Sequence, residues 1–261
     1  MKKLILILAL GFGLFTACKK GTLVENTTYE KLEIGSNKYA YLKLLNLSPG
    51  SPVVNFYVNG TKFSAGYSTS GLETGGFAYN GLFPSFGYAN TISGSQTLSA
   101  KTLAGASTDP NLEVFSTNIN PEGGKYYSII TNGLYNTSTK QIPSYKMIED
   151  VRPATDTTKV FIRLLNLYGG GPALDMLQDV TNEKIVSAVP SGEVSDWVTI
   201  PKPGQTNKYL LKDANTQETL GTLTATLTKG RAYTIYTRGI SGDSSFPFAV
   251  TFYTTFYSTI N

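Results

Sequence analysis

The stretch Tyr41-Leu-Lys-Leu-Leu-Asn-Leu47 occurs twice in this chain, the second time as Phe161-Ile-Arg-Leu-Leu-Asn-Leu167. At this offset of 120 residues an aromatic residue aligns with an aromatic residue, a cation aligns with a cation, and Leu-Leu-Asn-Leu is identical. Each copy then runs into a Gly-x-Pro turn, at residues 50–52 and 170–172. A repeat of this period predicts that one structural unit occurs twice.

The sequence around the first copy is typical of β-strands separated by tight turns. Ser48-Pro-Gly-Ser-Pro52 is a turn cluster, residues 53–58 form a second apolar run, and Asn59-Gly60 is a strong hairpin signal. A glycine-bounded strand at residues 123–133 also has a second copy, at residues 230–239, now at an offset of 106. These features predict antiparallel β structure, without the helices of a βαβ unit.

Within the repeated strand, Lys43 and Asn46 interrupt an otherwise apolar run. Successive strand residues point to opposite faces of a sheet, so a mixed pattern indicates one buried face and one face that is partly in contact with water. We therefore expect one face of the repeated strand to be buried and part of its other face to be in contact with water.

The chain as a whole predicts an all-β protein. Its 261 residues include Gly 26, Tyr 17 and Phe 13, only 15% of them are charged, and no stretch shows sustained helical periodicity. We predict two tandem immunoglobulin-like or Greek-key β-sandwich domains, at residues 39–151 and 159–261, joined by a linker at residues 152–158. Between the two repeated strands the first copy holds 14 more residues than the second, and most of the excess lies in residues 66–86.

The N-terminal residues have the features of an export signal. Lys2 and Lys3 precede an apolar run that is too short to span a bilayer, and the only cysteine of the chain, Cys18, follows it. This resembles a bacterial lipoprotein signal, which implies that residues 1–17 are removed and that Cys18 carries lipid. Residues 18–38 predict a flexible tether. We expect the protein to partner the membrane through its lipid, as an outer-membrane lipoprotein of the cell envelope. Its periplasmic or surface placement stays open.

The composition excludes several kinds of chemistry. The chain has no histidine, which removes the commonest general base and a common zinc ligand. It also has no Gly-x-x-x-x-Gly-Lys-Ser/Thr motif for phosphate binding. We predict no catalytic residue, no metal site, no cofactor and no enzymatic activity. The formal net charge is +4, and it becomes smaller once Lys2 and Lys3 are removed. Because nucleic-acid binding needs clustered positive charge, we predict no nucleic-acid partner.

Three stretches carry a resemblance to a known family: residues 44–52, Phe56-Tyr-Val-Asn-Gly60 and Gly124-Lys-Tyr-Tyr127. With them the chain resembles a tandem pair of the bacterial domain of unknown function 4397, although its second half matches more loosely. The resemblance implies a secreted or lipid-anchored β-sandwich protein of the Bacteroidetes type. Some members are labelled as cell-adhesion proteins, and the resemblance brings no catalytic residue with it.

The insertion at residues 66–86 is the sharpest candidate for a binding surface, because it is rich in glycine, asparagine and aromatic residues. Aromatic side chains can form a stacking platform for a glycan or a protein. Alternatively, they cover the open edge or end of the first sandwich, or its contact with the second domain. The candidate residues are Tyr67, Phe77, Tyr79, Asn80, Phe83 and Phe86.

One further site is predicted in the linker. Asp156-Thr-Thr158 resembles the three-residue motif that exported Bacteroidetes proteins use for O-glycosylation, and this points to Thr157 as the modified residue. The motif lies in a segment that we expect to be exposed, which suits such a modification.

These observations predict a non-enzymatic, membrane-anchored envelope lipoprotein that acts in adhesion or binds an extracellular polymer, a glycan or a partner protein. The alternative is a structural envelope spacer or assembly component with no soluble ligand. A third hypothesis, a hydrolase, would require two carboxylates at glycosidase spacing in a cleft.

Overall fold

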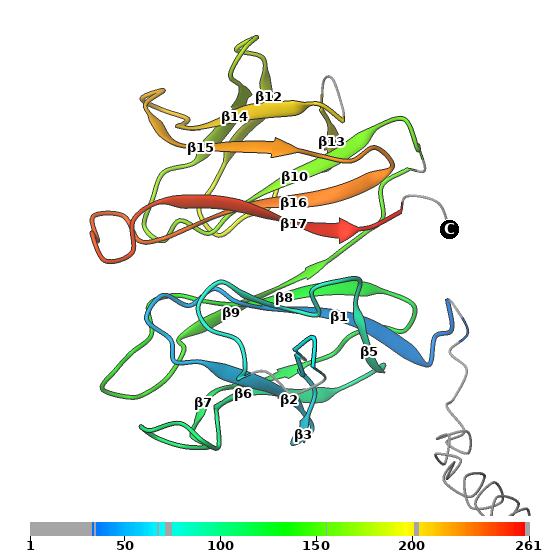
Figure 1. The fold of residues 1–261 in the computed structure, drawn as a ribbon, viewed down its shortest axis with the longest axis vertical. Helices are drawn as coiled ribbons and strands as arrows, with labels where there is room; N and C mark the ends of the chain where they lie inside the picture. The colour runs from blue at the N-terminus through cyan, green and yellow to red at the C-terminus, as the bar shows by residue number, and fades with distance from the viewer. Residues whose placement is uncertain are drawn as a thin grey trace, which may run out of the picture. The chain divides into compact units, whose positions relative to one another are not determined.

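The computed structural model of the protein describes residues 33, 35–66, 68–70, 75–154, 156–200 and 204–258. The described residues from Gly35 onward belong to one compact unit. All the regular elements in the described ranges are β-strands, so the predicted all-β sandwich class is confirmed (Figure 1). The predicted signal, the lipidation site Cys18 and nearly all of the tether lie outside the described residues.

The first half of the compact unit contains two sheets (Figure 1). One has the strand order β4-β1-β8-β9, with β5 also paired to β1, and the other has the order β3-β2-β6-β7. The strands are β1 (Tyr39–Asn46), β2 (Val54–Val58), β3 (Thr61–Lys62), β4 (Gly81–Phe83), β5 (Ala89–Ile92), β6 (Gln96–Thr102), β7 (Glu113–Ile119), β8 (Tyr126–Asn132) and β9 (Ser144–Glu149).

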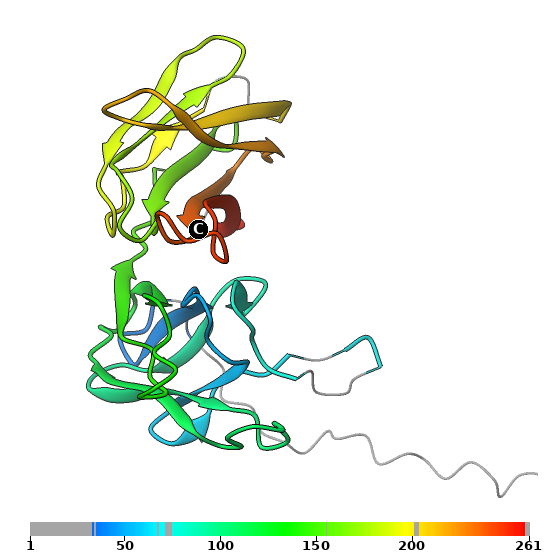
Figure 2. The ribbon, with the colours of Figure 1, turned by 90° about the vertical axis from the view of Figure 1, so that its left-hand side faces the viewer.

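The second half repeats this arrangement with the sheets β13-β10-β16-β17 and β12-β11-β14-β15. Figure 2 shows the green segment that leads from β9 into β10. The strands are β10 (Val160–Asn166), β11 (Leu174–Gln178), β12 (Lys184–Val189), β13 (Val198–Thr199), β14 (Thr206–Asp213), β15 (Thr219–Thr226), β16 (Arg231–Arg238) and β17 (Ala249–Phe256).

The sequence repeat corresponds to the same strand pairing in both halves. β1 pairs with β8 in parallel and places Tyr41 opposite Tyr126. β10 pairs with β16 in parallel and places Phe161 opposite Ala232. These partners are related by the offsets of 120 and 106 residues found in the sequence. In each half, the two repeated strands therefore lie beside each other in the middle of one sheet, which is β4-β1-β8-β9 or β13-β10-β16-β17. We call this sheet the inner sheet of that half.

The Asn59-Gly60 hairpin is confirmed. β2 and β3 pair antiparallel on either side of it, and both turn residues have positive φ, 48° at Asn59 and 76° at Gly60. Such angles are those of a primed turn, which matches the right-handed twist of the flanking strands. β1 does not pair with β2, however, because the turn after β1 carries the chain into the other sheet.

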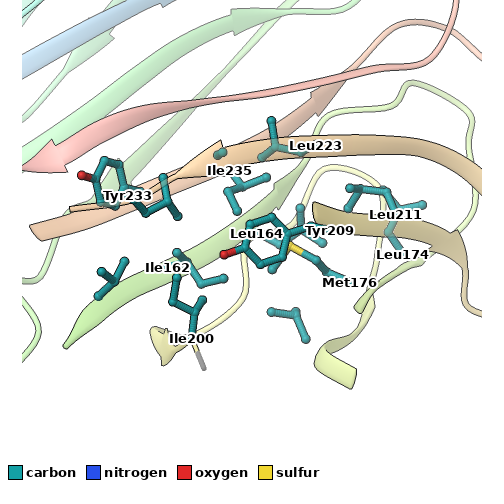
Figure 3. Packing of buried hydrophobic residues seen from close by; sticks show 14 of the residues in the cluster. Ile162, Leu164, Leu174, Met176, Ile200, Tyr209, Leu211, Leu223, Tyr233 and Ile235 are labelled. Atoms are coloured by element: carbon teal, nitrogen blue, oxygen red, sulfur yellow. The ribbon is translucent and has the colours of Figure 1, made fainter. Parts of the chain in front are cut away.

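Each half has its own apolar core between its two sheets. The core of the second half includes Leu164 of β10, Met176 of β11 and Ile235 of β16, as Figure 3 shows. The core of the first half includes Leu42 and Leu44 of β1, on the face that points toward β2 and β6. Alternate burial of this kind is what a sandwich of two sheets requires.

A third apolar cluster joins the two halves, and we call this contact the junction. It contains Leu45 and Ile130 of the first half together with Leu165 and Tyr236 of the second. β1 is consequently buried on both faces, which explains its nearly continuous apolar sequence. The expectation of a partly wet face was therefore wrong: Lys43 and Asn46 are both 0% exposed.

The predicted boundaries at residues 39–151, 152–158 and 159–261 remain a prediction. β9 ends at Glu149 and β10 begins at Val160, so the change of half falls where the sequence placed a linker. The shared cluster at the junction nevertheless means that the two halves are joined by more than this connection.

Candidate functional site

The residues predicted as one binding surface are distributed over several places. Phe77 forms a backbone bridge with Val54, and its ring makes an edge contact with Phe83 at 5.7 Å between centroids. Phe83 also makes an edge contact with Phe63 at 5.9 Å and packs against the core of the first half. Phe77 and Phe83 therefore cover the edge of the first sandwich. Tyr67 lies outside the described residues.

Tyr79 and Asn80 contact the second half. The Tyr79 ring lies 6.1 Å from the Phe246 ring, and the Arg238 guanidinium lies 5.2 Å from the Tyr79 centroid. The Tyr236 hydroxyl donates a hydrogen bond to Asn80 Oδ1 at 2.7 Å. These two residues therefore help to hold the junction, as the alternative interpretation of the insertion expected.

Phe86 is the exposed aromatic residue among the described members of the predicted set, with 77% of its surface in contact with solvent. Its ring packs against that of Tyr257, with centroids 5.6 Å apart and planes tilted by 45°. The Tyr257 hydroxyl donates a hydrogen bond to the Ser85 carbonyl at 3.2 Å, and the Arg231 guanidinium lies 5.4 Å from the Tyr257 ring. We call Phe86 and Tyr257 the aromatic pair; it brings together one residue from each half.

Lys43 binds the backbone of the loop that carries Phe86. Its ammonium group donates hydrogen bonds to the carbonyls of Gly87, at 2.6 Å, and Pro84, at 3.3 Å, on either side of the exposed ring. The same group lies 5.0 Å from the ring centroid of Tyr88 and 5.8 Å from that of Tyr253. Burial lowers the pKa of Lys43 to about 8, against an opposite effect of the Asp150 charge.

Asp150 connects Tyr88, which follows this loop, to Arg163 of the second half. Its carboxylate accepts hydrogen bonds from Tyr88, at 2.8 Å, from Ser128, at 2.7 Å, and from the guanidinium of Arg163, with which it forms a buried ion pair. Arg163 also donates to Thr234 at 2.9 Å. Burial and the Asp150 charge both raise the pKa of Tyr88. Every charged group here has a partner, as buried charges require.

A cleft of about 400 Å³ lies beside this network, between the start of β8 and the chain that leaves β9. We call it the linker cleft. Its lining includes one aromatic residue, Tyr126, and the charged residues Lys125, Glu149 and Arg152. Its full lining is residues 124–126 and 149–154. This volume lies at the lower end of the range of small-molecule sites.

Sequence reasoning missed Tyr257, Arg152 and the buried role of Lys43. One signal for Lys43 was present, because the repeat places a cation there and at Arg163. No comparable signal marks Tyr257, whose contact with Ser85 joins residues 172 positions apart in the chain.

The remaining expectations concern the linker, metals and the membrane. Thr157 is exposed in a turn, and Asp156 beside it accepts hydrogen bonds from the backbone and the hydroxyl of Thr158, which lower its pKa to about 2. Within the described ranges, no three His, Cys, Asp or Glu side chains are grouped as a metal ion would need. No helix long and apolar enough to cross a membrane occurs among the same residues.

Comparison with known families shows which family the chain belongs to. The model of a family described as "Domain of unknown function (DUF4397)" matches residues 40–177, slightly more than half of the chain. The chain belongs to the DUF4397 family. The match covers the strands of the first half and continues through β10 into β11 of the DUF4397 chain. No curated protein matches it.

Two solved structures show a distant likeness to this DUF4397 protein. The CBMbc module (family CBM26) of Eubacterium rectale Amy13K, in complex with maltoheptaose, is 12% identical with a TM-score of 0.27; the alignment covers 84% of this chain and 99% of that one. An alpha-glucan-binding streptococcal virulence factor is 11% identical with a TM-score of 0.25, over 83% and 97% of the two chains. Scores this low carry no argument about the ligand.

Proposed function

We propose that this protein is a non-catalytic, lipid-anchored component of the cell envelope that acts in adhesion by binding an extracellular glycan through the aromatic pair Phe86–Tyr257. The absence of histidine from the sequence supports a non-catalytic role. The lone Cys18 after a short apolar run supports the anchor.

The observation that carries the proposal is an exposed aromatic ring on a fixed backbone. Phe86 is 77% exposed, yet the carbonyls before and after it, those of Ser85 and Gly87, accept hydrogen bonds from Tyr257 and Lys43. Single exposed apolar residues are common and need no explanation. A ring carried on a backbone that is fixed on both sides loses less freedom on binding than one on a free loop, and this suits a recognition residue.

A saccharide suits the chemistry of the aromatic pair. The apolar face of a sugar ring can pack on an aromatic face, while hydroxyl groups at its edge form hydrogen bonds. Arg231, which lies over the Tyr257 ring, supplies donors beside the two aromatic rings.

A glycan array tests this proposal. Wild-type protein should bind at least one class of surface polysaccharide, and Phe86→Ala should weaken that binding by about tenfold or more, since a lost aromatic contact is worth about 1–3 kcal/mol. Val180→Ala is the matched control, because Val180 is 83% exposed and lies beyond β11, away from the pair. Equal binding by wild type and Phe86→Ala would refute the role of the pair.

The anchor is tested separately, by fractionation of cells that express Cys18→Ala. The variant should leave the membrane fraction, because the acyl chains supply the stable attachment. If it stays in the membrane fraction, the lipid anchor is refuted.

A second candidate function, a structural envelope spacer, is favoured by a different observation. The buried ion pair Asp150–Arg163 and the shared apolar cluster join the two halves. Two halves joined in this way would serve as a spacer without any ligand. An array on which wild-type protein binds no glycan would favour this alternative.

A further inference from the structure

The linker cleft shares no residue with the aromatic pair and has no role in the function proposed above, although its Arg152 contacts Phe256 and Ser258 on either side of Tyr257. Its walls are the first residues of β8 and the chain that follows β9, and Tyr126 is part of its lining.

Most charged groups of the cleft already have an ionic partner within the protein. Lys125 pairs with Glu122 at 2.9 Å and with Glu149 at 3.1 Å. Asp150 is turned toward Arg163 in the buried network. Among the described residues, no carboxylate pairs with Arg152 within ion-pair distance, so Arg152 is the lining cation without a counter-charge.

Arg152 is nevertheless held in a defined position. Its guanidinium lies 4.6 Å from the Phe256 ring centroid and 5.9 Å from that of Tyr126. One of its N–H groups donates to the Ser258 carbonyl. A guanidinium carries five N–H donors in a planar fork, and a fork stacked on aromatic rings is already oriented for two parallel hydrogen bonds to an oxyanion.

The polar groups beside the cation suit a saccharide better than a free ion. The Tyr126 ring stacks on Tyr41, with centroids 4.7 Å apart, and two further rings contact it edge-on at 5.1 and 5.6 Å. This packing fixes the wall of the cleft. Glu149 offers carboxylate oxygens as acceptors and Lys125 offers donors, so sugar hydroxyls find both kinds of partner in the same cleft.

We propose that the linker cleft is a second binding site, and that it takes an acidic saccharide whose carboxylate or sulfate group pairs with Arg152 while its hydroxyl groups bind Lys125 and Glu149. The negative charge at the other end of the cleft does not cancel this pairing. Glu122 and Glu149 share Lys125, and Glu122 is 65% exposed, so water and salt screen the charge that remains.

Isothermal titration of the purified full chain tests the proposal with four probes: a galacturonic acid trimer, galactose 6-sulfate, a neutral galactose trimer and a triglutamate peptide. The galacturonic acid trimer or the sulfated sugar should bind at least about tenfold more tightly than the neutral trimer, because a charge-assisted pair is lost with the acid group. The two acidic arms show whether carboxylate or sulfate is preferred.

Arg152→Gln should lower the affinity for the acidic probe by about tenfold or more. The affinity of Arg152→Lys should lie between those of Arg152→Gln and wild type, because lysine keeps the charge but not the planar guanidinium. Lys208→Gln is the control, since Lys208 is an exposed cation in the other half, paired with Asp179 at 3.4 Å. Near-ultraviolet circular dichroism checks that each variant is folded.

Three results would overturn the proposal. These are equal affinity of Arg152→Lys and wild type for the acidic probe, equal affinity of wild type for acidic and neutral trimers, and binding of triglutamate as tight as that of the acidic sugars. Failure of the array experiment with Phe86→Ala would leave this site untouched, because the two sites share no residue.

Discussion

The repeated asparagine has the same role in both halves. Asn46 Oδ1 accepts a hydrogen bond from Thr131 at 3.2 Å, and Asn166 Oδ1 accepts one from Thr237 at 3.0 Å. Each pair lies directly across the parallel strands of the inner sheet. Asn166 Nδ2 also donates to the carbonyl of Pro172 in the Gly-x-Pro turn, at 3.0 Å. A strand buried on both faces keeps an amide here because buried polar groups need protein partners.

The buried Lys43 predicts an unusual pH dependence of stability. Burial lowers its pKa from the ordinary 10.5 to about 8. Between these values the unfolded chain holds the proton that the folded protein has lost, so the free energy of unfolding should increase as the pH rises from about 8 to about 10. The increase should reach about 2–3 kcal/mol. Urea titrations at pH 7.5, 8.5, 9.2 and 10 measure it.

Lys43→Met is the control for this prediction. It keeps a long side chain without the titrating group, so its free energy of unfolding should not rise over the same pH interval. The pKa values of the buried Tyr88 and Tyr253 are raised, mainly by burial, and their ionisation lowers stability only above about pH 10. A rise of equal size in wild type and Lys43→Met would show that another group is responsible.

At the scale of single strands, the sequence predicts where several of the strands begin and end. The apolar run at residues 39–47 corresponds to β1, and the stretch at residues 145–150 corresponds to β9 within one residue at either end. Strand identity is encoded locally by alternation, β-branched and aromatic residues and turn signals. Which strand lies beside which is not encoded locally, and the parallel pairing of β1 with β8 was not predicted for that reason.

Gly239, directly after β16, is required by a close backbone approach. Its φ is +112°, and a Cβ there would overlap the carbonyl oxygen of Pro247. Gly239→Ala should therefore lower the free energy of unfolding by about 3 kcal/mol or more. Gly192 is the matched control: its φ is +86°, but a Cβ there meets nothing within 4 Å, so Gly192→Ala should cost only about 1–2 kcal/mol.

Chemical denaturation of the two glycine variants separates conformational strain from steric overlap. Equal losses of stability in both would mean that the turn after β16 can move to accommodate a methyl group. In that case Gly239 would not fix the approach of residues 246–247 to the end of the strand.

At the scale of the whole molecule, the sequence locates the aromatic insertion, but its residues have different roles in the structure. The sequence marks residues 66–86 as rich in aromatic residues, yet Tyr79 contacts the second half and Phe86 is exposed. The difference comes from partners such as Tyr257, far away in the chain, whose positions depend on the complete fold. A contact between the halves was one of the alternatives for the insertion, but the burial of β1 in it was not predicted, because Lys43 has the sequence pattern of a solvent-exposed residue.

The junction predicts how the protein behaves when the linker is cut. A protease site inserted between Thr157 and Thr158, which are exposed in a turn, should be cleaved without separation of the two halves. Separation would expose the shared cluster of Leu45, Ile130 and Leu165 to water and would leave the charge of Arg163 without Asp150.

Size-exclusion chromatography of the cleaved protein gives the answer. A single peak at the elution volume of the uncut chain is expected, with both fragments visible on a denaturing gel. Two well-resolved peaks of lower mass would show instead that the halves are independent domains connected by the linker alone.

The position of β1 has a mechanical consequence. β1 is the first strand after Gly35, and it is paired with β8 along one edge and with β4 and β5 along the other. Tension applied at the amino-terminal end of the compact unit would act along the axis of β1, while its hydrogen bonds run across that axis. Bonds arranged in this way share a shearing force and must break together. Traction on that end would therefore spread through the whole inner sheet before any strand could peel away.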